Sequence, residues 1–487
     1  MSPRGTKIFR DAVHNYIHVP RDICAAFIDT PIFQRLRHIE QTSMRPLYPS
    51  AHHDRFAHSL GVYHLASTAF SHICENTDTT LLPGIKLSDY TRPFEIGALM
   101  HDCGHSPFSH LFEVHYNRNG RALAFLNEQV SERFKKDYES RLEATEKRVE
   151  PAPHEVFSAA IFLKHYGQKY RDLLPGRDPE LIARMITGTT YARPENIGEQ
   201  CENCLVMLIN GGAIDVDKLD YIIRDSWASG VNNISIDTTR LLSAMQIVKY
   251  DMSLVPGFKK SALSVIQNVV DARNYLYTWI YSHHTVLYHH DLLKDALVKV
   301  SRLISGDENP DAFIDAVFSR EPFDRVVDVG TARIFLPCDG DIYYQLKAHS
   351  ANVPQADEIL SRTPCLVPLW KTKAEFELVF ALKTPEQRAH IRANLKDFLA
   401  PVLNNPELTS KVKFIKARAK VVNIHQSRIH VSIGGGVERY SDLKITPRTV
   451  HEPEHELDPT YFLVFIPRES VSLTAACVQA LKTASVY

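Results

Sequence analysis

The stretch that decides the fold reads FEIGALMHDCGHSPFSH, residues 94–110. An apolar segment ends there in His101-Asp102, and it is followed by Gly104 and Pro107, two residue types that end helices. The pattern predicts a buried helix that carries a metal-binding pair at its inner end. Two more His-Asp pairs occur, at 53–54 and 290–291, so the apolar neighbourhood is what sets the middle pair apart.

The composition is that of a globular protein with a large core. The chain has 487 residues, 44% of them hydrophobic, and its net charge of −1 indicates no general affinity for nucleic acid or membranes. The first residues contain no apolar signal segment, and no apolar run reaches the ~18 residues of a membrane-spanning helix. Eight cysteines without a compact framework fit a reducing compartment, so we expect a cytoplasmic protein without membrane contact.

Helical spacing of apolar residues dominates the chain up to about residue 305. An extended arm or short strand is expected at 6–21, and a proline-containing loop at 41–54. The span 113–153 is rich in charge, which favours a solvated helical insertion or a mobile loop over a lid or an interaction arm. Helical spacing at 22–40 is broken at Thr30-Pro31, where Pro31 could start a second helix capped by Thr30. Further helices are expected at 55–74, 94–102, 154–163, 181–186, 205–209, 214–225 and 262–305.

The sequence changes character near residue 306, where glycine and proline become more frequent. A helix is expected at 385–400, and short strands at 326–329, 376–380, 421–424, 429–433 and 461–466. We therefore expect a mainly α protein of two domains. These are a helical core at 1–305, including the charged insertion 113–153, and a smaller C-terminal α+β lobe at 306–487.

Four residues at the ends or polar faces of separate apolar helices form a candidate metal site: His58, His101, Asp102 and Asp217. Two neutral imidazoles and two carboxylates can hold one divalent or trivalent metal ion and leave coordination positions open. Such a metal can bind a phosphate oxygen and activate water. Nearby cationic and imidazole side chains would suit an anionic substrate, namely Arg55, His105, His110 and His154.

Taken singly, each of these residues has a simpler interpretation. A histidine at a helix end is more often a structural residue, and Asp217 could stabilise a helix N-terminus through the helix dipole. The tandem histidines at 283–284 and 289–290 could lie on the surface of an aromatic-rich helix. Only the order of the four candidate ligands on successive helices favours the metal site.

That order resembles the HD-domain metal-dependent phosphohydrolases, and further motifs resemble their deoxynucleoside triphosphate (dNTP) triphosphohydrolase branch. The branch includes bacterial dGTPases and the vertebrate dNTPase with a sterile alpha motif, a segment that this sequence is expected to lack. Five motifs occur in family order within residues 6–300: FRDAVHNYIHV (9–19), TPIFQRLRHIEQ (30–41), HHDRFAHSLGVYHLA (52–66), ALMHDCGHSPFSHLFE (98–113) and IDVDKLDYIIRD (214–225).

The resemblance implies an HD-domain helical core and a metal-dependent reaction at the α-phosphorus that releases a deoxynucleoside and triphosphate. It implies a metal ion, Mn, Fe, Mg, Co or Zn, held by His58, His101, Asp102 and Asp217. It also implies a set of catalytic histidines at the triphosphate, among which His110 would be the general acid or would orient water: His105, His110 and His154.

The same resemblance implies substrate contacts. Arg55 and Lys218 would contact phosphates, and Gln41 would bond the 3′-hydroxyl. Tyr221 and Asp225 would line the sugar, with Tyr221 excluding a ribose hydroxyl. The segment IYSHHTVLYHHDLL, residues 280–293, is similar to the bacterial pattern and adds two more contacts, Tyr281 and His284. Residues 42–49, TSMRPLYP, replace the glycine-rich loop of the vertebrate enzyme, so no base preference can be transferred.

The C-terminal lobe resembles the small lobe of the family only loosely, and we expect a regulatory or oligomerisation role for it. Its basic cluster is either a solvated strand or a surface for a nucleotide effector or single-stranded nucleic acid: Lys411, Lys413, Lys416, Arg418 and Lys420. The resemblance further implies a homo-oligomer (dimer, tetramer or hexamer), nucleotide activation, and a role in controlling dNTP pools or in defence against phage or virus. Two alternatives stay open: a hydrolase of another nucleotide or phosphate monoester, and a nucleotide-sensing or nucleic-acid-binding module.

Overall fold

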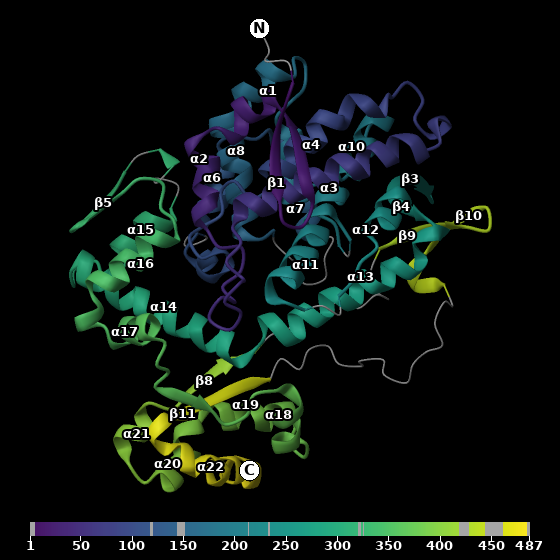
Figure 1. Ribbon diagram of the computed structural model, residues 1–487. Coiled ribbons are helices and arrows are strands. Elements are labelled where there is room, and N and C mark those ends of the chain that lie inside the picture. The colour runs from purple at the N-terminus through teal and green to yellow at the C-terminus, as the bar shows by residue number, and fades with distance from the viewer. Residues whose placement is uncertain are drawn as a thin grey trace. The chain divides into compact units, whose positions relative to one another are not determined.

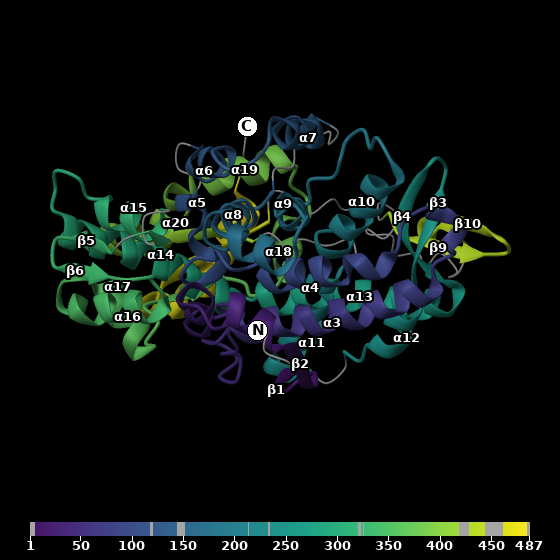
Figure 2. The same ribbon diagram turned by 90° about the horizontal axis from the view of Figure 1, so that it is seen from above.

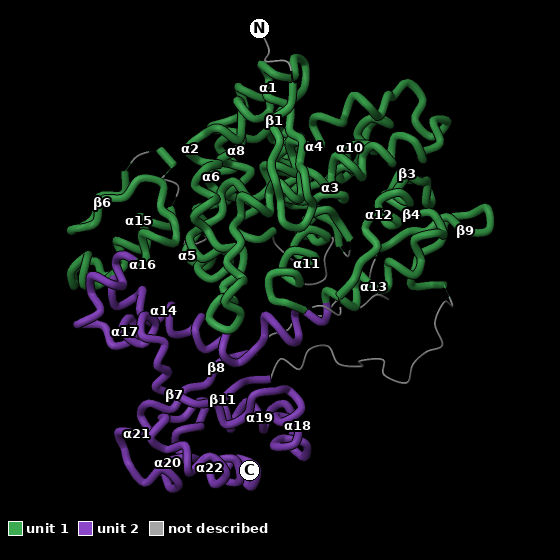
Figure 3. The backbone as a smooth tube through the Cα atoms, in the orientation of Figure 1, with its two compact units in different colours: residues 1–273, 301–343, 422–444 green, residues 274–300, 344–421, 445–487 purple. Residues whose placement is uncertain are grey.

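The computed structural model describes residues 5–116, 120–143, 151–212, 214–231, 234–319, 323–324, 326–417, 428–443 and 461–484. The described chain is mainly helical with small sheets, which confirms the expected fold class. It forms two compact units (Figure 3), the first made of 1–273, 301–343 and 422–444, and the second of 274–300, 344–421 and 445–487. The units alternate along the chain, whereas the sequence predicted one division near residue 305.

The first unit begins with an antiparallel hairpin, β1 (Thr6–Asp11) and β2 (Asn15–Pro20), where the extended arm was expected. Asp11 Oδ1 accepts hydrogen bonds from the backbone N–H groups of Val13 and His14, and Asn15 turns the chain with a φ of 64°. The expected break at Thr30-Pro31 is confirmed, since α2 (Pro31–Gln34) starts at Pro31 with Thr30 as its N-cap. The other pieces of this segment are also short: α1 (Arg21–Ile23), η1 (Cys24–Ile28) and η2 (Arg35–His38).

Long helices form the core of the first unit (Figures 1 and 2): α3 (Arg55–Asn76), α4 (Thr91–Met100), α8 (Pro153–Leu173), α9 (Glu180–Thr187), α10 (Ile197–Ile209) and α11 (Val216–Ser229). Two glycines let these helices approach each other closely. A Cβ at Gly61 of α3 would lie 1.9 Å from Asp220 Oδ1 of α11, and a Cβ at Gly104 would lie 2.8 Å from the backbone of Ser158 in α8.

The charged insertion forms three helices in its described part: α5 (Glu113–Tyr116), α6 (Arg121–Asn127) and α7 (Glu132–Glu143). The segment is helical, in agreement with the predicted helical insertion over a mobile loop, but it is not fully solvated. Phe134 of α7 is fully buried, and Arg184 of α9 donates a 2.9 Å hydrogen bond to Asp137 Oδ2. The helical spacing of a few apolar residues therefore outweighs the high charge of the segment.

The other elements of the first unit include a four-stranded sheet in the order β10-β9-β4-β3. Its strands are β3 (Met245–Tyr250), β4 (Ser253–Lys259), β9 (His430–Ile433) and β10 (Gly436–Arg439). β9 confirms the strand expected at 429–433, and it pairs in parallel with β4. The remaining elements are α12 (Thr238–Ser243), α15 (Ala312–Phe318), and the pair β5 (Val327–Val329) and β6 (Ala332–Ile334). Two helices begin in the first unit and end in residues of the second: α13 (Leu263–Tyr275) and α16 (Asp339–Ala348).

The second unit packs helices around a three-stranded sheet in the order β7-β11-β8. The strands are β7 (Leu366–Pro368), β8 (Lys413–Lys416) and β11 (Phe462–Pro467), of which β11 confirms the strand expected at 461–466. Its helices are α17 (Pro354–Ser361), α18 (Lys373–Phe380), α19 (Pro385–Ala393), α20 (Leu395–Leu403), α21 (Pro406–Ser410) and α22 (Thr474–Thr483), with α14 (His284–Ser305) up to residue 300.

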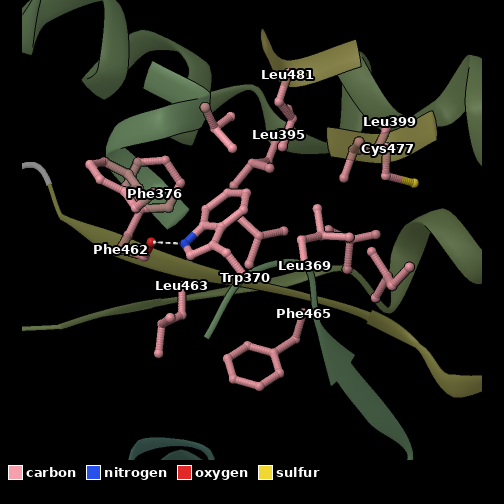
Figure 4. Packing of buried hydrophobic residues seen from close by; sticks show 14 of the residues in the cluster. Leu369, Trp370, Phe376, Leu395, Leu399, Phe462, Leu463, Phe465, Cys477 and Leu481 are labelled. Atoms are coloured by element: carbon pink, nitrogen blue, oxygen red, sulfur yellow. Dashed lines mark hydrogen bonds between the residues drawn. The ribbon is translucent and has the colours of Figure 1, made fainter. Parts of the chain in front are cut away.

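Trp370 lies at the centre of the second unit's core, where its Nε1 donates a 2.8 Å hydrogen bond to the backbone oxygen of Phe462 (Figure 4). The strand expected at 376–380 is wrong, because Thr372 and Glu375 form a capping box that starts α18 there. The helix expected at 385–400 is two helices, and the strand expected at 421–424 lies outside the described residues. Of the described helices, none has the length and apolar character needed to cross a membrane.

Candidate metal centre and histidine cluster

Four predicted ligands converge in the first unit. His58 comes from α3, His101 and Asp102 directly follow α4, and Asp217 lies in the first turn of α11. The Nε2 atoms of His58 and His101 are 3.2 Å apart, and Asp217 Oδ1 lies 3.1 Å and 3.6 Å from them. Asp102 Oδ2 lies 3.6 Å from His58 Nε2 and 3.4 Å from His101 Nε2.

The other nitrogen of each imidazole is held by a group that can only accept a hydrogen bond. His58 Nδ1 donates to Asp220 Oδ2 at 2.8 Å, and His101 Nδ1 donates to the backbone oxygen of Ala98 at 2.8 Å. Both Nε2 atoms therefore turn their lone pairs towards the carboxylates of Asp102 and Asp217.

This arrangement fits a metal ion. Ligand atoms that share one metal at bonds of about 2.1 Å lie about 3.0–3.4 Å apart, close to the separations seen here. Facing lone pairs and carboxylate oxygens repel one another unless a cation lies between them. Burial opposes charge on His58, but Asp217 and Asp220 raise the pKa of its imidazole to about 9.

Arg55, at the start of α3, joins this centre to the neighbouring residues. It is buried, and its Nη1 donates a 2.5 Å hydrogen bond to Asp102 Oδ2. Its Nε donates to Ser109 Oγ at 3.0 Å, and its Nη2 contacts the Gln41 backbone oxygen and His110 Nε2, each at 3.3 Å. Burial raises the pKa of the Asp102 carboxyl, but Arg55 together with His101 and His58 more than offsets this and holds it below its usual range.

The three predicted catalytic histidines form a second cluster around Glu113. His110 Nδ1 donates to Glu113 Oε1 at 2.9 Å, and His154 Nδ1 donates to the same oxygen. The ring of His105 stacks on that of His154 with centroids 4.3 Å apart, and both of its buried nitrogens lack a hydrogen-bond partner. The four side chains bring their nitrogen and oxygen atoms within 4.8 Å of one another.

Electrostatics give these histidines different protonation states. Burial disfavours the imidazolium of His154, but the Glu113 carboxylate raises its pKa to about 9. Burial and then the positive charge of Arg55 lower the pKa of His105 well below its usual value. The cluster therefore combines a protonated imidazole with a neutral one at neutral pH.

A strained turn directly precedes His110 of the histidine cluster. Phe108 and Ser109 both adopt the left-handed backbone region, with φ values of 57° and 52°. Asp339, at the start of α16, accepts hydrogen bonds from the backbone N–H groups of Phe108 at 2.6 Å and Glu40 at 2.8 Å. This buried carboxylate ties the turn that follows the His-Asp pair to the loop that precedes Gln41.

The predicted substrate contacts in the first unit have varied surroundings. Gln41 is buried, and its side-chain oxygen has no hydrogen-bond partner, as expected of a ligand-binding group. Lys218 Nζ donates to the Gly211 backbone oxygen at 2.9 Å and to Asp215, while Tyr221 OH accepts from Arg273 Nε at 3.0 Å. Asp225 Oδ1 accepts a 2.6 Å hydrogen bond from His53 Nε2. The phosphate and sugar roles of these residues stay predictions.

Two further predicted contacts, Tyr281 and His284, belong to the second unit. Burial, followed by the neighbouring His283, lowers the pKa of His284 to about 4. In the basic cluster, Lys411 pairs with Glu407 at 2.8 Å and Lys413 pairs with Asp291 at 2.6 Å. Arg418 and Lys420 lie outside the described residues.

Sequence reasoning missed Glu113, Asp220 and His14. Glu113 follows His110 by three residues, and Asp220 follows Asp217 by three, so helical spacing was the available signal. His14 lies in the first motif, but Asp220, its hydrogen-bond partner, is 206 residues away in the sequence, so local sequence patterns could not predict the contact.

Proteins of known sequence support the class of protein that the motifs predict. No protein-family profile matches this chain. The mouse (Mus musculus) deoxynucleoside triphosphate triphosphohydrolase SAMHD1 is 27% identical over 439 residues, which cover 82% of this chain and 61% of the relative. Its homologue in Dictyostelium discoideum is 26% identical over 319 residues, 64% of this chain and 54% of the relative. The chain spans about half the length of several curated relatives, such as an uncharacterised Mycoplasma pneumoniae protein, of which it covers 51%.

Solved structures show the same fold over nearly the whole chain. A phosphohydrolase from Bacteroides thetaiotaomicron matches with a TM-score of 0.62 at 17% identity, covering 95% of this chain and 100% of that one. A hypothetical protein from Aquifex aeolicus matches with a TM-score of 0.59 at 21% identity, covering 98% and 100%. The relatives and the five motifs support an HD-domain, dNTPase-like protein, and the solved structures show its fold. Among these relatives, the mouse and Dictyostelium proteins are named as triphosphohydrolases.

Proposed function

We propose that this chain is a metal-dependent hydrolase that converts deoxynucleoside triphosphates to deoxynucleosides and triphosphate. The observation that carries the proposal is the junction at Arg55, which contacts Asp102 of the metal centre and His110 of the histidine cluster. A metal site beside protonated and neutral imidazoles suits hydrolysis of an anionic substrate. The relatives named as dNTP triphosphohydrolases support this choice of substrate.

In this proposal His58, His101, Asp102 and Asp217 hold the metal. A bound divalent ion would supply positive charge for a phosphate oxygen and lower the pKa of a water molecule. Water attacks the α-phosphorus, the bond to the 5′-oxygen breaks, and that oxygen takes a proton as triphosphate leaves.

The other residues of the site have separate tasks in this reaction. His110, the most exposed member of the cluster, donates the proton or orients the water. Glu113 keeps His154 positively charged beside the phosphates. The side-chain oxygen of Gln41 accepts a hydrogen bond from a sugar hydroxyl.

Nucleotide activation and homo-oligomer formation are further parts of the proposal, and they rest on the resemblance alone. The ion pairs of Lys411 and Lys413 within the second unit leave less charge for single-stranded nucleic acid than the sequence predicted. Adding the dNTPs singly and as mixtures tests activation, and light scattering with and without nucleotide tests assembly.

The central experiment is product analysis by ion-exchange chromatography. The four dNTPs are supplied singly and mixed, with Mn²⁺, Fe²⁺, Mg²⁺, Co²⁺ or Zn²⁺. Equal amounts of deoxynucleoside and triphosphate support the proposal. Inorganic phosphate as the product would instead identify a hydrolase of another phosphate ester, and no turnover with any metal and mixture would favour a binding module.

A further inference from the structure

We propose that Asp220 and His14 are positioning residues that set the orientation and basicity of the metal-binding imidazole of His58. The inference rests on the proposed function only in taking the metal centre as the working site. A continuous chain of hydrogen bonds carries it. His14 Nε2 donates to Asp220 Oδ1 at 2.6 Å, and His58 Nδ1 donates to Asp220 Oδ2 at 2.8 Å.

The Asp220 carboxylate is fully buried, and each of its two oxygens accepts two hydrogen bonds. Besides the two imidazoles, Arg224 donates to it twice, from Nε to Oδ2 at 2.8 Å and from Nη2 to Oδ1 at 3.0 Å. A carboxylate that accepts four hydrogen bonds is held in one orientation, and its bond to Nδ1 holds the plane of the His58 ring.

Asp220 acts through the imidazole and does not itself ligate the metal. It contacts Nδ1, whereas Nε2 is the nitrogen that faces His101 and Asp217. A carboxylate bonded to Nδ1–H selects the tautomer with a free Nε2 lone pair and makes that nitrogen a stronger ligand. The Nδ1 atom of His101 is bonded only to the backbone oxygen of Ala98, so His58 is the imidazole ligand whose Nδ1 is bonded to a carboxylate.

The chain leaves space for this carboxylate by placing a glycine one turn after the ligand. A Cβ at Gly61 would lie 1.9 Å from Asp220 Oδ1 and 2.4 Å from Arg224 Nη2. Any side chain at this position would push the carboxylate away from both imidazoles. The segment His58-Ser-Leu-Gly61 therefore contains both the metal-binding histidine and the glycine that leaves room for the Asp220 carboxylate.

The N-terminal hairpin holds His14 in place. Asp11 fixes the turn through the N–H groups of Val13 and His14, and its Oδ2 accepts a 2.8 Å hydrogen bond from Arg224 Nη1. The hairpin is thus tied to α11 by both His14 and Asp11. The metal centre accordingly depends on residues near the start of the chain that lie far from every ligand in sequence.

The test measures Mn²⁺ binding without nucleotide, from the electron paramagnetic resonance signal of free Mn²⁺. Asp220→Asn keeps the shape but removes the charge, and its Kd should rise about 10- to 100-fold, the usual effect of losing a support of this kind. His14→Leu should raise the Kd several-fold, whereas His14→Gln, which keeps a donor for Asp220, should bind nearly as the natural protein does.

The matched control is Asp137→Asn, which neutralises another buried carboxylate paired with an arginine, Arg184 at 2.9 Å, with no link to His58. Thermal unfolding of each metal-free variant reports its general loss of stability. Asp137→Asn should lower stability and leave the Mn²⁺ Kd unchanged. If Asp220→Asn does not fold, the comparison of His14→Leu with His14→Gln decides alone.

Unchanged Mn²⁺ affinity in Asp220→Asn and His14→Leu would overturn the inference, as would an equal loss in Asp137→Asn. Failure of the natural protein to bind Mn²⁺ would overturn it as well. A natural protein that binds Mn²⁺ but hydrolyses no dNTP would contradict the proposed function and leave the positioning role standing. The two conclusions can therefore fail separately.

Discussion

At the scale of single residues, the site is defined by which nitrogen of each histidine faces the centre. His58 and His101 direct Nε2 inwards because their Nδ1 atoms are bonded to Asp220 and to a backbone oxygen. His154 directs Nδ1 to Glu113 and is held protonated. The same residue type thus fills two roles, which are set by the acceptor beside it.

Removing a ligand should abolish both metal binding and hydrolysis. His101→Ala and Asp102→Ala each take away a donor atom of the proposed metal centre and should lower bound metal and dNTP turnover by at least about a hundredfold. Metal content by mass spectrometry and product release measure the two effects. His290→Ala, in the other apparent His-Asp pair on α14, should keep its metal, and full activity in His101→Ala would contradict the site.

The pair Glu113–His154 should make stability depend on pH in a defined window. In the folded protein the pKa of the His154 imidazole is about 9, above its ordinary value of 6.5. Protonated His154 therefore adds to the free energy of unfolding, fully below pH 6.5, and this contribution is lost as the pH rises through about 9. The size is on the order of 3 kcal/mol at most, because one pKa unit corresponds to about 1.4 kcal/mol.

Glu113→Gln tests this pair. Its thermal stability should fall below that of the natural protein at pH 6–7, and the gap should narrow as the pH is raised above 9, as measured by differential scanning calorimetry. Glu132→Gln, which loses an exposed pair with Lys135, is the control and should show little change across the window. A gap that stays constant from pH 6 to 10 would contradict the assigned protonation of His154.

At the scale of elements, close contacts between helices decide the geometry. Gly61 brings α3 onto α11, and Gly104 brings the turn after α4 onto α8. The insertion helix α7 packs on the core through Phe134, while Arg184 stacks on Tyr191 with its charge 3.9 Å from the ring centroid. The described part of the charged segment therefore packs on the core of the first unit.

Phe134→Ala should loosen α7. Removing a fully buried phenylalanine leaves a cavity and should cost about 3–5 kcal/mol. Proteolysis under native conditions should then cut faster within 121–143. Val114→Ala, at a position 69% exposed on α5, is the control that should change neither stability nor cleavage. Equal protection of both variants would mean that α7 is not anchored by its apolar face.

At the scale of the whole molecule, the chain forms two units with separate cores. The metal centre and the histidine cluster lie in the first, and the core around Trp370 lies in the second. A chain of this kind can unfold in more than one step, since each unit has its own apolar core.

Trp370→Phe should affect the second unit alone. It leaves the buried oxygen of Phe462 without its donor and should cost about 2–3 kcal/mol. Calorimetry should show one transition at lower temperature, while the Mn²⁺ Kd stays unchanged. Leu382→Ala, at a residue 97% exposed in the same unit, should leave both transitions in place. A change in metal affinity in Trp370→Phe would contradict the independence of the cores.

The sequence by itself determined the helical class and the chemistry available to the site. The apolar run before His101-Asp102 specifies a buried helix, and the spacing of His58 and Asp217 on other helices specifies a donor set. These are local properties, because helical periodicity and helix ends are encoded within a few residues.

Only the tertiary structure decided how those residues are used. It brought Asp220 and His14 behind His58, bonded Lys218 to Asp215, and returned 428–443 to the first unit as strands beside β4. It also showed 376–380 as helix, where alternating residues had predicted strand. The physical reason is the same throughout: a hydrogen-bond partner or packing surface far away in sequence outweighs the local preference.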